Sequence, residues 1–168
     1  MIRTIAAILG VLALAGCAAE YVPPEQPAFY LDLAHGGAKL DPAVAASMIS
    51  GYRANNGLGP VTVDPGLMQV AETQSMAMAK RNKMDHDVVG TLPKRLASAH
   101  YPATLAVENI GAGYHTLAEA FSGWRDSPHH RENMLKKGVN KLGIAATYAP
   151  NTKYKVFWAL VLASTDER

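Results

Sequence analysis

The feature that most constrains the fold is an uninterrupted apolar segment near the end of the chain, residues 156–163. Such a run, bounded by turn residues, is typical of a strand that is buried on both faces. Apolar residues recur at alternate positions of 142–148, and Pro150-Asn151-Thr152 provides a turn between the two segments. The sequence therefore predicts a C-terminal antiparallel hairpin, with Trp158 of its second strand in the core.

Helical patterns precede this hairpin. Asp41-Pro42 and Asp64-Pro65 each place an N-cap residue before a proline at the first helical position. Residues 116–119 form a capping box, and Ser127-Pro128 starts another helix, with Ser127 as its N-cap. Helices followed by strands indicate an α+β layered domain, with Trp124 on a core-facing helix side. The predicted helices cover residues 42–55, 65–83, 91–99 and 117–126, and a fifth begins at Pro128.

Composition excludes several classes of protein. The 168 residues are enough for one domain, and the net charge of +2 comes from charges of both signs along the chain. Because no basic stripe is present, nucleic acid is not expected as a partner. The apolar fraction of 49% is too high for a disordered chain, and glycine and proline follow no fixed period.

The first residues read as a targeting signal. Arg3 precedes an uncharged apolar run, residues 5–14, and small residues follow it. The uncharged stretch of residues 4–19 is shorter than the roughly 20 residues of a spanning helix, although a permanent membrane helix is an alternative. Leu14-Ala15-Gly16-Cys17 resembles the lipobox of bacterial lipoproteins, in which the cysteine is lipidated and becomes the first residue of the mature chain. A small apolar cysteine without modification is the other interpretation of Cys17.

These features predict a division of the chain into three parts. Residues 1–16 are expected to be a lipoprotein signal peptide, and residues 17–40 a lipidated cysteine followed by a spacer containing proline and glycine. The domain is expected over residues 41–168. Phe29, Tyr30 and Leu31 are rather apolar for a tether, which leaves open that part of the spacer packs on the domain. The mature protein should then be held by acyl chains at a membrane, outside the cytoplasm and on the periplasmic side in a diderm cell.

Chemistry in this chain must rely on histidines, carboxylates and hydroxyls, because Cys17 is the single cysteine. The sequence contains no His-Glu-x-x-His helix, no Gly-x-Ser-x-Gly elbow and no phosphate loop. Gly111-Ala112-Gly113 is interpreted as a flexible turn, since no long apolar strand leads into it. The polar residues that remain as candidates for a functional site are His86, Glu108-Asn109 and His130-Arg131-x-Asn133.

The order of these motifs resembles the CAP superfamily of cysteine-rich secretory, antigen 5 and pathogenesis-related proteins, in its bacterial form. The resemblance spans residues 41–163 and implies a three-layer α-β-α sandwich. The matching segments are Tyr52-Arg53-x-x-Asn56-Gly57-Leu58, Met84-x-His86, Glu108-Asn109-Ile110-x-x-Gly113, Trp124-x-x-Ser127-Pro128-x-His130-Arg131-x-Asn133-Met134-Leu135 and Leu142-Gly143-Ile144.

The resemblance also implies a site. In many eukaryotic members two histidines and two glutamates line a central cleft and can hold a divalent metal; His86, Glu108 and His130 match three of these four. The fourth falls near Asp126 or Ser127, where this chain departs from the pattern. Two imidazoles and one carboxylate are a ligand set that zinc accepts with water as its fourth ligand. Buried histidines without metal remain the alternative, and the cleft set also includes Asn109 as polar scaffolding.

Two functions from different classes follow from these observations. The first is a monomeric, membrane-anchored envelope lipoprotein whose CAP-like domain binds a lipid, a cell-wall component or a divalent metal without turnover. The second is a metal-assisted hydrolase of an envelope ester or peptide, in which His86, Glu108 and His130 hold a zinc-bound water. No second carboxylate is evident as its general base. A purely structural envelope protein is a third hypothesis, because a fold alone does not determine function.

Overall fold

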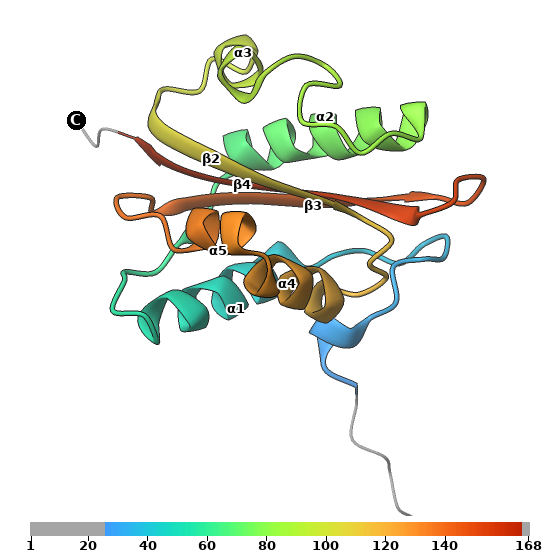
Figure 1. Cartoon of the computed structure of the whole chain (residues 1–168), viewed down its shortest axis with the longest axis horizontal. Helices are drawn as coiled ribbons and strands as arrows, with labels where there is room; N and C mark the ends of the chain where they lie inside the picture. Colours follow the sequence, from blue (N-terminus) through green and yellow to red (C-terminus); the bar gives the residue numbers. More distant parts are fainter. Residues whose placement is uncertain (1–25, 166–168) are drawn as a thin grey trace, which may run out of the picture.

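The computed structural model describes residues 26–165 and confirms an α+β fold. A central sheet is covered by α2 and α3 on one face and by α1, α4 and α5 on the other, which makes a three-layer α-β-α sandwich (Figure 1). The elements are η1 (Ala28–Tyr30), α1 (Pro42–Ala54), β1 (Thr62–Val63), α2 (Pro65–Arg81), α3 (Leu92–Ser98), β2 (Ala103–Ala112), α4 (Leu117–Asp126), α5 (Pro128–Met134), β3 (Lys141–Ala149) and β4 (Lys155–Thr165).

The strands lie in the order β1-β3-β4-β2. The predicted hairpin is confirmed: β3 and β4 pair antiparallel, with Tyr148 opposite Val156 next to the turn. β2 pairs antiparallel with the other side of β4, and the short β1 pairs parallel with β3. β4 therefore lies inside the sheet, and β2 lies at one of its edges.

The strand β2 corrects the sequence analysis, which expected a flexible turn at residues 111–113 and no long strand before it. Gly111 and Ala112 are the last residues of β2, and only Gly113 has the positive φ, +89°, that favours glycine. The prediction was wrong because Glu108-Asn109 interrupts the apolar pattern of the strand. Both residues are nevertheless buried, with 7% and 1% of their surface exposed.

Side chains of β4 alternate between two hydrophobic cores, as the period of two of a strand requires. One set packs with α1, α4 and α5, and the other packs with α2 and α3. Trp124 of α4 and Trp158 of β4 are both buried in the first core, as predicted, and their rings meet edge to face with centroids 6.3 Å apart. The first set is Val156, Trp158, Leu160 and Leu162, and the second is Phe157, Ala159, Val161 and Ala163.

Local capping explains where most helices begin. The side chains of Asp41 and Asp64 accept hydrogen bonds from backbone N–H groups in the first turns of α1 and α2. Thr116 and Glu119 complete the predicted capping box of α4. Ser127 occupies the N-cap position of α5, but its side chain makes no capping hydrogen bond, which corrects the role expected for it.

A glycine allows α2 to lie close against the sheet. A Cβ atom on Gly143 of β3 would stand 2.1 Å from the carbonyl carbon of Leu67, so any larger residue would push the helix away. Farther along the same helix, the hydroxyls of Ser75 and Thr147 are 2.8 Å apart and join α2 to β3. This packing fixes α2, and with it the segment that follows the helix and carries His86.

Arg53 of α1 fixes the position of α5 in the helical layer on the opposite face of the sheet. Arg53 is 2% exposed, and its guanidinium donates to the backbone carbonyls of Gly59, Met134, Lys136 and Val139 at 2.8 to 3.1 Å. The contacts tie α1 to the end of α5, where unpaired carbonyls favour a positive charge. Arg53 thereby positions the short helix that carries His130.

The segment before α1 packs on the domain. Leu33 is 4% exposed within the first core, and its backbone N–H donates to the carbonyl of His115 at 2.8 Å. Phe29 of η1 packs against the same core.

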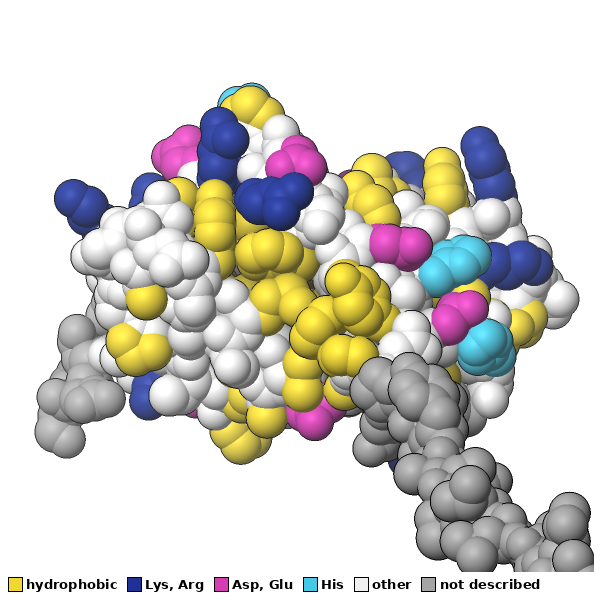
Figure 2. Space-filling model, turned by 90° about the horizontal axis from the view of Figure 1, so that it is seen from below, with side chains coloured by type: hydrophobic (Ala, Val, Ile, Leu, Met, Phe, Trp, Pro, Cys, Tyr) yellow, Lys and Arg dark blue, Asp and Glu magenta, His cyan; other side chains and the backbone are white. Residues whose placement is uncertain are grey.

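On the face formed by α1, α4 and α5, hydrophobic side chains gather in the middle, and acidic and basic groups are interspersed around them (Figure 2).

The signal peptide and Cys17 lie outside the described residues. Within residues 26–165, no helix combines the length and the apolar character needed to cross a bilayer.

The buried strand can be tested with Trp158→Ala. The loss of the indole from the first core should lower the free energy of unfolding by about 3–5 kcal/mol. The change also removes the hydrogen bond from the indole N–H to the carbonyl of Tyr114. Urea denaturation measures the difference, and Tyr30→Ala, at a residue that is 49% exposed, is the control that should stay close to wild type. An unchanged midpoint for Trp158→Ala would contradict the placement of β4.

Candidate functional site

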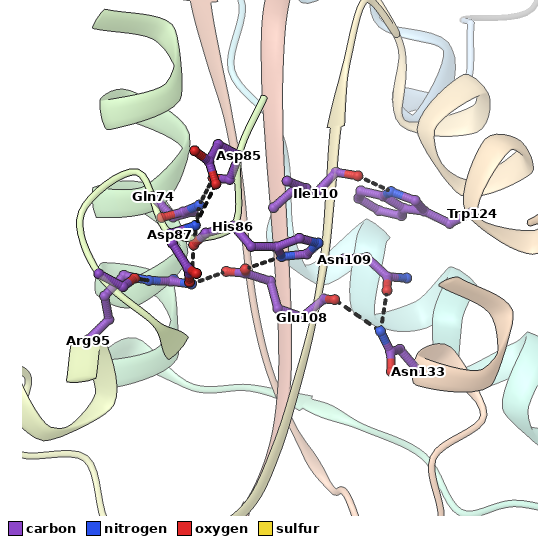
Figure 3. A network of polar contacts seen from close by, with 11 residues as sticks. Gln74, Asp85, His86, Asp87, Arg95, Glu108, Asn109, Ile110, Trp124 and Asn133 are labelled. Atoms are coloured by element: carbon purple, nitrogen blue, oxygen red, sulfur yellow. Dashed lines mark hydrogen bonds and ion pairs between the residues drawn. The ribbon is translucent and has the colours of Figure 1, made fainter. Parts of the chain in front are cut away.

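The candidate site lies on the edge strand β2, where two adjacent polar residues are buried. Successive side chains of a strand point to opposite faces. Ile110 belongs to the core under α2 and α3, so Glu108, two residues before it, faces the same layer. Asn109 faces the layer of α5, and Figure 3 shows the two polar networks on opposite sides of the strand. The two networks thus meet at one edge of the sheet.

The carboxylate of Glu108 is the centre of the first network. Its Oε1 lies 2.7 Å from Nη2 of Arg95, and its Oε2 lies 2.8 Å from Nδ1 of His86 (Figure 3). The side chains of Glu108 and Arg95 are each 4% exposed, whereas that of His86 is 55% exposed. A buried carboxylate is costly unless it is paired, and here a guanidinium and an imidazole share it. The result is a half-exposed imidazole whose inner nitrogen is held by a buried acid.

Two further side chains hold the segment that carries His86. Nε2 of Gln74, on the buried side of α2, donates to the carbonyls of Asp85 and His86 at 2.8 and 3.1 Å. Arg95 donates from Nε to the carbonyl of Gly90 and from Nη2 to the carbonyl of His86. The backbone on both sides of the imidazole is therefore attached to α2 and α3, so the imidazole is presented from a fixed backbone.

The second network connects α5 to β2. Nδ2 of Asn109 donates to the carbonyl of His130 at 2.9 Å. Nδ2 of Asn133 donates to Oδ1 of Asn109 and to the carbonyl of Glu108 at 2.9 and 3.0 Å. These contacts agree with the scaffold role expected of Asn109, and they hold the first turn of α5, with His130, against the strand that carries Glu108.

The two imidazoles have opposite shifts in pKa. The hydrogen bond to Glu108 is the main cause that raises the pKa of His86 above its ordinary value, although partial burial opposes it. Burial lowers the pKa of His130, and the charges of His86 and His129 lower it further. His86 therefore keeps its proton to a higher pH than His130, and the charge of one imidazole affects the other.

The site does not assemble the metal ligands expected from the resemblance. Within residues 26–165, no three His, Cys, Asp or Glu side chains are grouped so that they could hold a metal ion. Both oxygens of Glu108 already face a cation or an N–H donor. Asp126 is 66% exposed and forms a two-point ion pair with Arg125, at 2.8 and 3.1 Å, instead of joining the site. These contacts argue against the zinc site expected from His86, Glu108 and His130.

Arg95 and Gln74 are the site residues that the sequence analysis did not identify. A signal existed for both of them. Arg95 follows Leu92 by three residues and precedes Leu96, so helical spacing places it on the apolar side of α3. Gln74 likewise lies among the apolar residues of α2. A polar residue on the buried side of a helix indicates a buried partner, but it does not say which one.

Comparisons with known proteins agree with this fold. The model of the cysteine-rich secretory protein family, CAP, matches residues 46–162. Protein YkwD of Bacillus subtilis, which is uncharacterised, is 30% identical over 94 residues, which are 55% of this chain and 37% of YkwD. An extracellular protein of Bacillus anthracis with an SCP domain superposes with a TM-score of 0.65 and 26% identity, over 73% of this chain and 40% of that one.

A second solved structure is similar over its whole length. An outer surface protein of Borrelia burgdorferi has a TM-score of 0.67 and 21% identity, and the match covers 77% of this chain and 99% of that one. At that identity the likeness shows the fold alone. The chain spans less than half the length of YkwD and of the Bacillus anthracis protein.

The Glu108–His86 contact can be tested with Glu108→Gln. Without the carboxylate charge, the pKa of His86 should fall, which NMR titration of the imidazole C–H signals measures. In wild type, the stability that His86 contributes is complete below the ordinary histidine pKa and is lost as the pH rises through its raised folded pKa. For His130 the pH dependence is reversed, because its pKa is lowered in the folded protein. The fold loses stability as the pH falls below the ordinary histidine pKa, since the unfolded chain then binds a proton that folded His130 does not. Glu119→Gln is the matched control, and an unchanged His86 pKa in Glu108→Gln would contradict the contact.

Proposed function

This chain belongs to the CAP family of cysteine-rich secretory proteins, and we propose that it is a monomeric, lipid-anchored envelope protein that binds a ligand at the edge of β2 without chemical turnover. The ligand is a polar group of a cell-wall component or of a lipid, and it is recognised by His86 together with His130. Glu108, Arg95, Asn109 and Asn133 position these two histidines.

The observation that carries this proposal is an exposed imidazole in a fixed orientation. Nδ1 of His86 is engaged by Glu108, so Nε2 is the ring nitrogen that remains for a ligand. A binding group whose orientation is fixed before the ligand arrives loses little conformational entropy on binding. His130 on α5 adds a second imidazole with a lowered pKa, which favours a neutral ring able both to donate and to accept hydrogen bonds.

The anchor is supported by the lipobox-like sequence that ends at Cys17 and by its short distance along the chain from Phe29, which packs against the first core. Twelve peptide steps separate Cys17 from Phe29, so an extended chain reaches about 40 Å at most. A lipid on Cys17 would keep the site close to a membrane surface. Two of the similar solved structures are described as an extracellular protein and as an outer surface protein, which agrees with a location outside the cytoplasm.

A metal-assisted hydrolase is not proposed, because Glu108 is already paired and Asp126 points elsewhere. The pair of His86 and Glu108 does resemble the base and its orienting acid in a catalytic triad. Such a pair needs a nucleophile, and the hydrogen bonds of residues 26–165 give Nδ1 or Nε2 of His86 no hydroxyl or thiol partner. A binding role therefore agrees better with the contacts of the site.

Ligand binding can be tested by NMR with two probes, soluble peptidoglycan fragments and phospholipid vesicles. The correct probe should shift the imidazole signals of His86 and His130, and His86→Ala should weaken its binding by about tenfold or more, the equivalent of about 1.4 kcal/mol. His35→Ala is the control, because His35 is exposed and pairs with Asp32 outside the site. Equal affinity in wild type and His86→Ala would contradict the proposed site.

The anchor can be tested by intact-mass measurement of the mature protein purified from membranes. The mature chain should begin at Cys17 and carry acyl chains, and Cys17→Ala should abolish the acylation. Because the chain has no other cysteine, an unmodified mature protein that begins at another residue would rule out this anchor.

A further inference from the structure

We propose that Arg95 supplies, at Glu108, the positive charge that a metal ion supplies in the site implied by the family resemblance. The site then holds a carboxylate that is already neutralised by the protein itself, and Glu108 serves to orient His86 instead of binding a metal. The inference deepens the proposed function and rests on it only for the location of the site.

The first argument is the occupation of the carboxylate. A zinc ion binds a carboxylate oxygen at about 2.0–2.2 Å. Nη2 of Arg95 stands 2.7 Å from Oε1, and Nδ1 of His86 stands 2.8 Å from Oε2. A metal bound to Glu108 must therefore displace one of them or lie beside a buried guanidinium, and two neighbouring positive charges repel strongly where water is excluded.

The second argument is that Arg95 cannot easily give way. Its side chain is 4% exposed, and its Nε and Nη2 also donate to the carbonyls of Gly90 and His86. A guanidinium does not lose its proton in a protein, so deprotonation cannot remove its charge. Arg95 is thus a permanent cation that the segment around His86 needs for its own conformation.

The third argument is the lack of a second acidic ligand. Asp126, the carboxylate nearest to the position of the fourth family ligand, is 66% exposed and paired with Arg125. Among residues 26–165, Glu108 is not grouped with two further His, Cys, Asp or Glu side chains that could hold a metal with it. A carboxylate that binds zinc contributes its negative charge to the metal, and the charge of Glu108 is already balanced by Arg95.

Calorimetry with zinc chloride on the mature full-length protein tests the inference. Wild type and Glu108→Gln should bind zinc with the same affinity or not at all, because Glu108 is not a ligand. Arg95→Gln should gain at least tenfold in zinc affinity, because it frees the carboxylate beside His86, and the gain should disappear in Arg95→Gln/Glu108→Gln. Arg125→Gln is the matched control, since it removes an arginine from an exposed pair and should gain nothing.

Two outcomes would overturn the inference. One is a zinc site in wild type that loses tenfold or more of its affinity in Glu108→Gln; the other is a folded Arg95→Gln that gains none. If Arg95→Gln does not fold, the zinc affinities of wild type and Glu108→Gln decide whether Glu108 is a ligand. The carboxyl ¹³C signal of Glu108 provides a second measurement, and zinc should leave it unshifted in wild type. Ligand binding by wild type that requires zinc would also overturn this inference while leaving the proposed binding site in place, so the two failures are distinguishable.

Discussion

The fold depends on the burial of β4 on both faces. All eight side chains from Val156 to Ala163 are at most 1% exposed, and full burial of each large one contributes about 1.5–3 kcal/mol. A strand of this kind needs a neighbour on each side and a helical layer on each face. β3 and β2 therefore flank it, and α1, α4 and α5 oppose α2 and α3 across the sheet. The edge position of β2, where the site forms, follows from this arrangement.

At that edge, successive side chains of β2 point to opposite faces of the sheet, so Glu108 and Asn109 have different roles. Glu108 faces α2 and α3 and organises His86, whereas Asn109 faces α5 and holds the backbone at His130. Adjacent residues of one strand thus connect the two helical layers and bring two imidazoles into the same electrostatic environment. Arg95 makes the arrangement stable, because a buried carboxylate without a cation would be strongly unfavourable. The group that this arrangement presents at the surface is the imidazole of His86, held in a fixed orientation.

The sequence predicts those features that local signals determine. Asp41, Asp64 and the capping box at Thr116 mark helix starts within a few residues, and the apolar run marks β4. β2 could not be identified in this way, since Glu108-Asn109 breaks its pattern and the partners that make their burial favourable are distant in sequence. Arg95 was missed for the same reason: its partner lies 13 residues farther along the chain, on another element. The metal site was expected because a family pattern names ligands, but it does not show that Arg95 already pairs with one of them.

The most direct measurement is a high-resolution crystal structure of the protein soaked in zinc, with anomalous diffraction recorded at the zinc edge. We expect Nη2 of Arg95 to remain within ion-pair distance of Oε1 of Glu108, and Nδ1 of His86 to remain on Oε2. No anomalous peak should then lie within bonding distance of Glu108. A zinc ion bound to Glu108, with Arg95 displaced, would contradict the assignment of Arg95 as the cation of this site.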